Sequence, residues 1–227
     1  MPITPCKLDD LPQGSRWLVL APHADDESIG CGGLIYALGK AGHQVDVVVV
    51  TEEEQDPNLP STKNLRWQEF LAAAKIIGFK PYGFGIPDGK VTANERIFKT
   101  KLAEHLEHKK YDWIVCPFPS DHHCDHRATA EHLSVFLSEK NIDARLLCYE
   151  VWSTLWPNRV LDISSHMSHK LAAIRCYMSQ LYSVPYDRGI EGLNAYRGML
   201  AGFEYGEAYY ETDTAGIAKL VDLQKKL

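Results

Sequence analysis

The sequence predicts an α/β fold, a three-layer sandwich built on a mostly parallel sheet. Short apolar runs alternate along the chain with segments of helical period, which is the pattern of repeated βαβ units. With 227 residues, 45% of them hydrophobic, the chain is long enough to bury a large core within one domain. We find no internal repeat and no linker that would separate two domains.

The first βαβ unit begins with the apolar run WLVLA at 17–21. The segment ESIGCGGLIYALGKAG at 27–42 predicts a helix that stops near its last two glycines. The second strand, VDVVVVT at 45–51, is apolar on both faces, as a central parallel strand should be. A polar loop with two prolines follows at 51–62.

The alternation continues to the region of Tyr182. We first predict a helix that ends at Gly78 and is marked by Trp67, Phe70, Leu71, Ala74 and Ile77, and then a short strand that enters a Pro-Asp-Gly turn within 81–90. A helix at 97–108 and a strand at 111–118 follow, and then a helix marked by Ala130, Leu133 and Leu137 and a strand at 144–152. A sixth strand is predicted in RVLDIS, followed by a helix marked by Leu171, Ile174 and Met178.

The last part of the chain differs in composition. From Tyr182 onward, tyrosines occur among glycines and charged residues. We expect residues 182–227 to form a C-terminal covering segment of a single domain that spans 1–227. Its tyrosines are expected to pack over the sheet edge, with stacking on a sugar ring or a subunit contact as alternatives.

Charge and cysteine content narrow the choice of partners. A net charge of −6 and a pI near 5.9 provide no general basic field, so we expect no binding to nucleic acid or to anionic membranes. The six cysteines are scattered and form no CxxC pair, which favours a reducing compartment. No secretory leader and no apolar run of membrane length is apparent. We therefore expect a cytoplasmic protein that acts on a small molecule. The sequence leaves open whether the chain forms a homo-oligomer.

Two clusters of histidine and acid follow predicted parallel strands. PHADDE follows the strand that ends at Ala21, and PSDHHCDHR follows the strand that ends near Phe118. Because the carboxyl ends of parallel strands open at one edge of a sheet, both clusters are expected to share a site. Two imidazoles and a carboxylate are a common ligand set for catalytic zinc, and a cation would also neutralise adjacent carboxylates. The pooled candidates are His23, Asp25, Asp26, Asp121, His122, His123, Asp125 and His126.

These motifs resemble a known family. PHADDESIGCGG resembles the (A/P)HPDDE signature of the PIG-L/LmbE-type zinc-dependent N-deacetylases, and DHHCDHRAT resembles their downstream HPDHR element. Weaker similarities are Arg66 and Glu69 in an R-x-x-E helix and the segments IPDGK, YEVW and MSQ, so that the resemblance spans roughly residues 17 to 200. It implies a Rossmann-like fold. Ala24 and Cys124 stand where the family usually has proline.

The resemblance also implies roles for individual residues. His23, Asp26 and His126 would bind Zn²⁺, or another divalent metal such as Fe²⁺, and Asp25 would be the general base. His123 would stabilise the oxyanion and be oriented by Asp125. The implied reaction hydrolyses a linear amide C–N bond, removing an N-acetyl group from an N-acetylglucosamine-type sugar conjugate to give acetate and a free amine.

Other interpretations stay open beside these. Arg66 would bind substrate or pair with Glu69, and Asp88 would form its turn or reach the site. His122 is expected to be solvated, and GCGG at 30–33 to allow close helix–sheet packing rather than to bind a dinucleotide. The competing functions are an amidase acting on a thiol conjugate or another N-acyl substrate, and a metal-binding or sugar-binding protein without catalysis.

Overall fold

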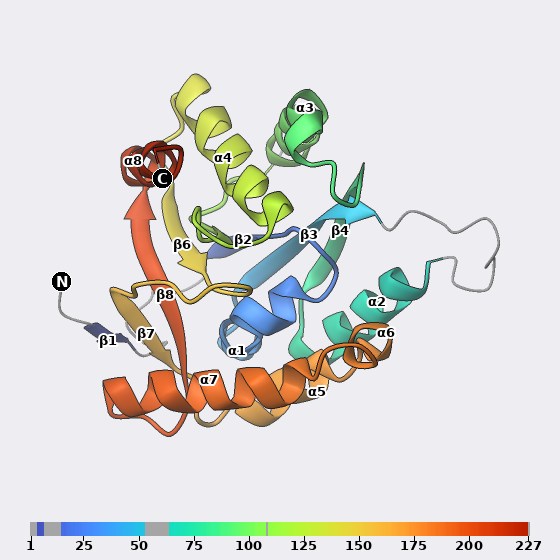
Figure 1. The fold of residues 1–227 in the computed structure, drawn as a ribbon, viewed down its shortest axis with the longest axis vertical. Helices are drawn as coiled ribbons and strands as arrows, with labels where there is room; N and C mark the ends of the chain where they lie inside the picture. The colour runs from blue at the N-terminus through green and yellow to red at the C-terminus, as the bar shows by residue number, and fades with distance from the viewer. Residues whose placement is uncertain (1–3, 7–14, 53–63, 108, 227) are drawn as a thin grey trace.

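The predicted α/β architecture is confirmed by the computed structural model, which describes residues 4–6, 15–52, 64–107 and 109–226. Within these described residues, one sheet of eight strands has the order β1-β7-β8-β6-β5-β2-β3-β4 (Figure 1). The strands are β1 (Thr4–Cys6), β2 (Arg16–Ala21), β3 (Gln44–Glu52), β4 (Lys80–Pro87), β5 (Trp113–Pro117), β6 (Arg145–Tyr149), β7 (Arg159–Asp162) and β8 (Gly206–Asp213).

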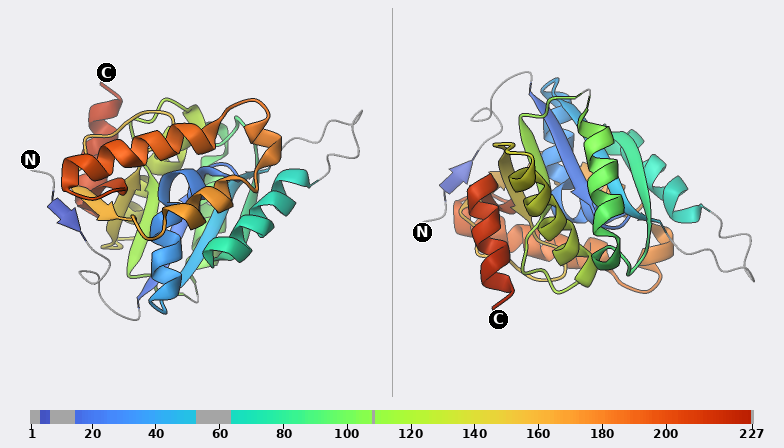
Figure 2. Two further views of the ribbon diagram at one scale, coloured as in Figure 1. Left: turned by 90° about the horizontal axis from the view of Figure 1, so that it is seen from below. Right: turned by 90° about the horizontal axis from the view of Figure 1, so that it is seen from above.

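Helices cover both faces of this sheet. They are α1 (Asp26–Lys40), α2 (Leu65–Ile77), α3 (Glu95–Leu106) after a short 3₁₀ turn, α4 (Cys124–Glu139), α5 (Met167–Ile174), α6 (Met178–Leu181), α7 (Tyr186–Ala201) and α8 (Thr214–Gln224). One apolar core joins alternate strand residues to α1, α2 and α5, and a second joins the other strand residues to α3, α4 and α8. Figure 2 shows the second set of helices side by side and α7 on the opposite face.

The pairing of β2 places both sequence motifs at one edge. β2 is parallel to β3 on one side and to β5 on the other, with Val19 in register with Val47 and Val115. The chain therefore leaves β2 after Ala21 and β5 after Pro117 in the same direction. These two exits lead into α1 and α4, and the motif residues lie in the connecting segments and in the first turns of these helices.

The segment from residue 182 on does more than cover the sheet. It supplies α7 and α8 as covering helices, but between them β8 inserts into the sheet, antiparallel to both β6 and β7. Tyr209 on this strand is buried in the core instead of packing over an edge. The expected covering segment thus supplies two helices and, in addition, a strand paired between β6 and β7, whose buried acid Glu207 lies 2.7 Å from Lys170.

Two other predicted elements are shorter than expected. The strand predicted at 144–152 ends at Tyr149, and the helix marked by Leu171 and Ile174 ends before Met178, which begins α6 and is exposed. The polar loop predicted at 51–62 lies, from residue 53, outside the described residues, as does His108. No helix in the part of the chain that the structure describes is long and apolar enough to cross a membrane.

The glycines of GCGG allow α1 to lie close to the sheet, as predicted. A Cβ on Gly30 would stand 2.2 Å from the Tyr149 ring of β6, and one on Gly33 would stand 2.7 Å from Ile163. The helix is kinked at Cys31, and the Glu207 carboxylate accepts the N–H groups of Gly33 and Leu34 beyond the kink. A buried acid thus satisfies backbone donors that the kink frees from the helix.

Candidate active site

The three predicted metal ligands converge between the two strand exits. His23 lies in the turn after β2, Asp26 begins α1, and His126 lies in the first turn of α4. Asp26 Oδ2 is 3.1 Å from His23 Nδ1 and 3.1 Å from His126 Nε2, and the two ring nitrogens are 3.2 Å apart. Donors about 2.0–2.1 Å from a tetrahedral zinc stand roughly 3.3 Å from one another. The three residues therefore fit a small divalent cation in both spacing and donor type.

The electrostatics of this cluster also suit a cation. Burial lowers the pKa of His23, but hydrogen bonds to nearby carboxylates, that of Asp125 foremost, raise it to about 12. Burial likewise lowers the pKa of His126, and the charge of Asp26 together with the Asp121 carboxylate raises it to about 9. The neighbouring carboxylates stabilise the protonated, positively charged form of both imidazoles. A divalent ion that binds here would displace these protons and supply the positive charge in their place.

Each histidine of the cluster has a carboxylate at its other nitrogen. His23 Nε2 lies 3.3 Å from Asp125 Oδ2 and 3.2 Å from Asp88 Oδ1, and His126 Nδ1 lies 3.3 Å from Asp121 Oδ1. Such outer carboxylates fix the orientation and tautomer of metal-binding histidines. Asp121, which the sequence placed among the candidates without a role, therefore contacts the site through His126.

Asp25 lies in the pocket beside the cluster in an unusual backbone conformation. Its φ of 150° is one that L residues rarely adopt, and such strain of about 1–3 kcal/mol is typical of functional positions. The Glu27 carboxylate accepts its backbone N–H, while Arg66 Nη2 stands 3.4 Å from its Oδ1. Burial, together with the neighbouring Asp26 charge, raises the pKa of Asp25 to about 8.

Glu27, the third acid of the motif, has a positioning role that sequence did not assign. It lies in the first turn of α1 as predicted, fully buried, and accepts hydrogen bonds from Ser28 Oγ and the Tyr177 hydroxyl. The first turn of α1 is thereby tied to the segment after α5.

His123 caps α4 and reaches the same pocket. Its Nδ1 accepts the backbone N–H of Asp125, so in the neutral ring the proton is on Nε2. The ring meets that of His23 edge-on, with centroids 4.6 Å apart. Asp125 thus contacts this ring through its backbone N–H, while its carboxylate accepts the N–H groups of Gly89 and Val91 and faces His23.

The two weaker candidates also lie in the site. Arg66 donates to the Ala24 carbonyl and contacts Asp25, and Asp88 lies within 4.0 Å of the guanidinium. The alternative pairing of Arg66 with Glu69 is wrong, since the Glu69 carboxylate accepts hydrogen bonds from Ser179 on α6.

These residues open into a small pocket of about 190 Å³. Three of its lining residues were missed by sequence analysis, namely Trp152, Gln180 and Tyr186. They come from the loop after β6, from α6 and from the start of α7, and no spacing in the sequence connects these segments. Trp152 and Gln180 are the last residues of the YEVW and MSQ segments, to which the family resemblance assigned no role in the site, and Tyr186 is one of the tyrosines for which stacking on a sugar ring was an alternative.

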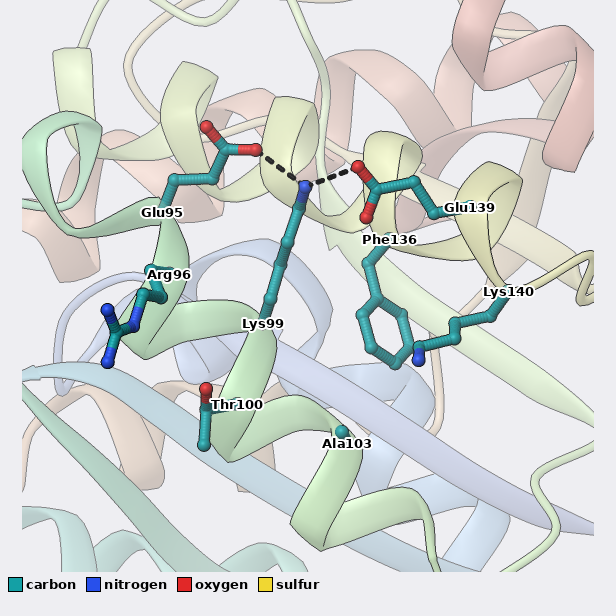
Figure 3. Close-up of a pocket in the computed structure, with 8 residues that line it drawn as sticks. All are labelled: Glu95, Arg96, Lys99, Thr100, Ala103, Phe136, Glu139 and Lys140. Carbon is teal, nitrogen blue, oxygen red and sulfur yellow. Dashed lines mark hydrogen bonds and ion pairs between the residues drawn. The ribbon is translucent and has the colours of Figure 1, made fainter.

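A larger hollow between α3 and α4 lies apart from the candidate site. Figure 3 shows Lys99 at its centre, with ion pairs to Glu95 at 2.6 Å and to Glu139 at 2.9 Å. None of the predicted site residues lines it. His122 is exposed, as predicted.

The fold and the site define a class: an α/β protein with a candidate metal centre, flanked by a further carboxylate, at the carboxyl ends of parallel strands. Residues 18–136, which include both motifs, match the model of the family PIG-L, GlcNAc-PI de-N-acetylase. The chain belongs to the PIG-L family.

Solved structures share this fold over most of the chain. N,N'-diacetylchitobiose deacetylase from Pyrococcus horikoshii has a TM-score of 0.77 at 23% identity, covering 88% of this chain and 85% of that one. The zinc-inhibited form of teicoplanin deacetylase Orf2 has a TM-score of 0.70 at 17% identity, covering 87% and 97%. GalB, the 4-carboxy-2-hydroxymuconate hydratase from Pseudomonas putida KT2440, has a TM-score of 0.70 at 19% identity, covering 87% and 96%. Since one fold carries different reactions, the activity has to be argued from the site.

Proposed function

We propose that the protein is a zinc-dependent hydrolase that removes an N-acetyl group from an N-acetylglucosamine-type sugar conjugate. The observation that carries this proposal is the triangle of His23 Nδ1, Asp26 Oδ2 and His126 Nε2, with sides of 3.1–3.2 Å, beside Asp25 in one pocket. Membership of the PIG-L family and the likeness to deacetylases of known structure support the same reaction class.

Each group in the pocket has a task in amide hydrolysis. A divalent ion held by His23, Asp26 and His126 would polarise the acyl carbonyl and lower the pKa of water. Its charge would also lower the pKa of the neighbouring Asp25, so that this carboxyl is ionised and can act as a base. The Asp25 carboxylate takes the proton of the attacking water, and Arg66 holds one of its oxygens at 3.4 Å. His123 Nε2–H donates to the acyl oxygen as it becomes negative, a contribution of about 3 kcal/mol.

The proton then has to reach the leaving amine. His123 Nδ1 is occupied as an acceptor, so the neutral ring would become an imidazolate if it gave up its Nε2 proton. We therefore assign that step to the protonated Asp25 carboxyl, which returns the water proton as the C–N bond breaks and acetate forms.

Two other functions compete with this one. An amidase acting on a thiol conjugate or another N-acyl compound would use the same residues, and a protein that only binds metal or sugar would need no base. The strained conformation of Asp25 favours catalysis over binding alone, because binding alone does not require a carboxylate to be held at that position.

The test combines metal analysis with product release. Purified protein should contain about one divalent ion per chain, and replacing His23 or His126 with Ala should remove it. Acetate release should be measured on N-acetylglucosamine, N,N'-diacetylchitobiose, nucleotide sugars and N-acylated thiol glycosides. Asp25→Asn should retain metal and lose roughly 10²–10⁴-fold in kcat. Asp143→Asn, an exposed aspartate before β6, is the matched control. Undiminished turnover in Asp25→Asn would refute the assigned base.

A further inference from the structure

Trp152 occupies the rim of the candidate pocket and is half exposed. It comes from the loop after β6, lines the pocket, and leaves 49% of its surface accessible to water. The Tyr186 ring meets it nearly perpendicularly, at 81° and a centroid distance of 5.9 Å. A large apolar ring in this position offers a flat surface to whatever enters the pocket.

The loop that carries Trp152 is firmly held. The backbone N–H of Trp152 donates to Asp121 Oδ2 at 3.1 Å, and the backbone N–H of Leu155 donates to Glu150 Oε2 at 2.8 Å. Arg197 of α7 donates twice to the Glu150 carboxylate, at 2.9 and 2.6 Å, and once to the Leu155 carbonyl. Since Glu150 and Arg197 are both buried, the indole is presented by a preorganised backbone and little ordering is needed on binding.

The size of the pocket sets how much substrate it can hold. Its volume of about 190 Å³ is below the roughly 300–1,000 Å³ that usually encloses a drug-sized ligand. A conjugate with two rings is larger than this space, so part of it would extend past the rim, where Trp152 lies.

We propose that Trp152 forms an outer subsite, where its indole stacks on the apolar face of a second ring of the substrate. This proposal rests on the proposed deacetylase function and narrows the substrate class to conjugates with a sugar or aromatic ring next to the N-acetylated sugar. Sugar rings and aromatic aglycones share the flat apolar face that a tryptophan ring binds. Trp152 therefore determines specificity for the length of the substrate.

The experiment compares short and extended substrates in two tryptophan variants. Acetate release is measured on N-acetylglucosamine, on N,N'-diacetylchitobiose and on an aryl glycoside of N-acetylglucosamine. In Trp152→Ala, kcat/KM should fall roughly tenfold more on an extended substrate than on the monosaccharide, and the difference should lie in KM. Trp152→Phe should recover part of the loss. Trp156→Ala is the matched control, since Trp156 lies in the same loop, is 80% exposed and does not line this pocket.

The outcomes separate the two proposals. Loss on the disaccharide alone identifies a second sugar, and loss on the aryl glycoside alone identifies an aromatic aglycone. Equal loss on the monosaccharide and both extended substrates, or no loss on any, overturns the outer subsite while the deacetylase proposal stands. If the wild type releases no acetate from any N-acylated substrate, the proposed function itself fails. Thermal unfolding of each variant identifies any loss caused by misfolding.

Discussion

Replacing Gly30 with Ala should move α1 away from the sheet and loosen the candidate site. The new Cβ would lie 2.2, 2.7 and 2.9 Å from three atoms of the Tyr149 ring. Carbon atoms pack best at about 3.5–4.0 Å, so the helix or the ring has to move by more than about 1 Å. The Tyr149 ring cannot turn aside freely, because it is fully buried and its hydroxyl donates to the Leu20 carbonyl at 2.9 Å.

The magnitude follows from these contacts. Overpacking costs about 1–3 kcal/mol, and losing the Tyr149 hydrogen bond adds about 1 kcal/mol. The higher helix propensity of Ala returns about 1 kcal/mol, which leaves a net loss of about 1–3 kcal/mol in the free energy of unfolding. For a chain of this length, each kcal/mol lowers Tm by about 2–4 °C. Because Asp26 lies one turn before Gly30, metal affinity should fall as well.

Thermal unfolding and chelator competition check both parts of this prediction. Gly39→Ala near the end of the same helix is the matched control, since the nearest atoms to its Cβ would be the carbonyl oxygens of Gly78 and Ile77, at 3.4 and 3.7 Å. Adding Tyr149→Leu should restore part of what Gly30→Ala loses, through a coupling of the two substitutions. A Gly30→Ala protein with the Tm and metal affinity of the wild type would refute the packing argument.

Three further changes test other parts of the structure. Lys170→Met leaves the buried Glu207 carboxylate without its cation, so the free energy of unfolding measured in urea should fall by about 3–5 kcal/mol. Adding Glu207→Gln should regain part of this loss, and unchanged stability of Lys170→Met would contradict the buried pair. Asp121→Asn should weaken metal binding roughly tenfold or more, because His126 loses the carboxylate at its Nδ1; equal affinity in chelator competition would rule this out. Burial and the Lys109 charge lower the pKa of His105 from 6.5 to about 4, so the folded state loses stability as the pH falls through that interval. His105→Asn should flatten this loss in unfolding measured against pH, and an identical pH profile would argue against it.

Local pattern was enough to predict most of the fold. Strands such as 17–21 and 45–51 are short apolar runs, and helices such as α2 repeat apolar residues every three or four positions, so neighbouring residues alone reveal them. β8 escaped prediction because its sequence, GEAYYETD, begins with glycine and contains three acids. Partners on other elements stabilise the buried acid of this strand, since Lys170 and the N–H groups of Gly33 and Leu34 donate to Glu207.

The candidate site, like the fold, was predictable from local sequence pattern only in part. Two short motifs, each directly after a strand, contain His23, Asp25, Asp26, His123 and His126, so local pattern was enough to predict that they meet at one edge of the sheet. Contacts between segments about a hundred residues apart decide which ring nitrogen of His23 and His126 faces the cluster. The same contacts decide which carboxylate lies at the other nitrogen. The pocket wall of Trp152, Gln180 and Tyr186 is likewise a product of the tertiary structure, because three separate segments meet there through packing that no local pattern encodes.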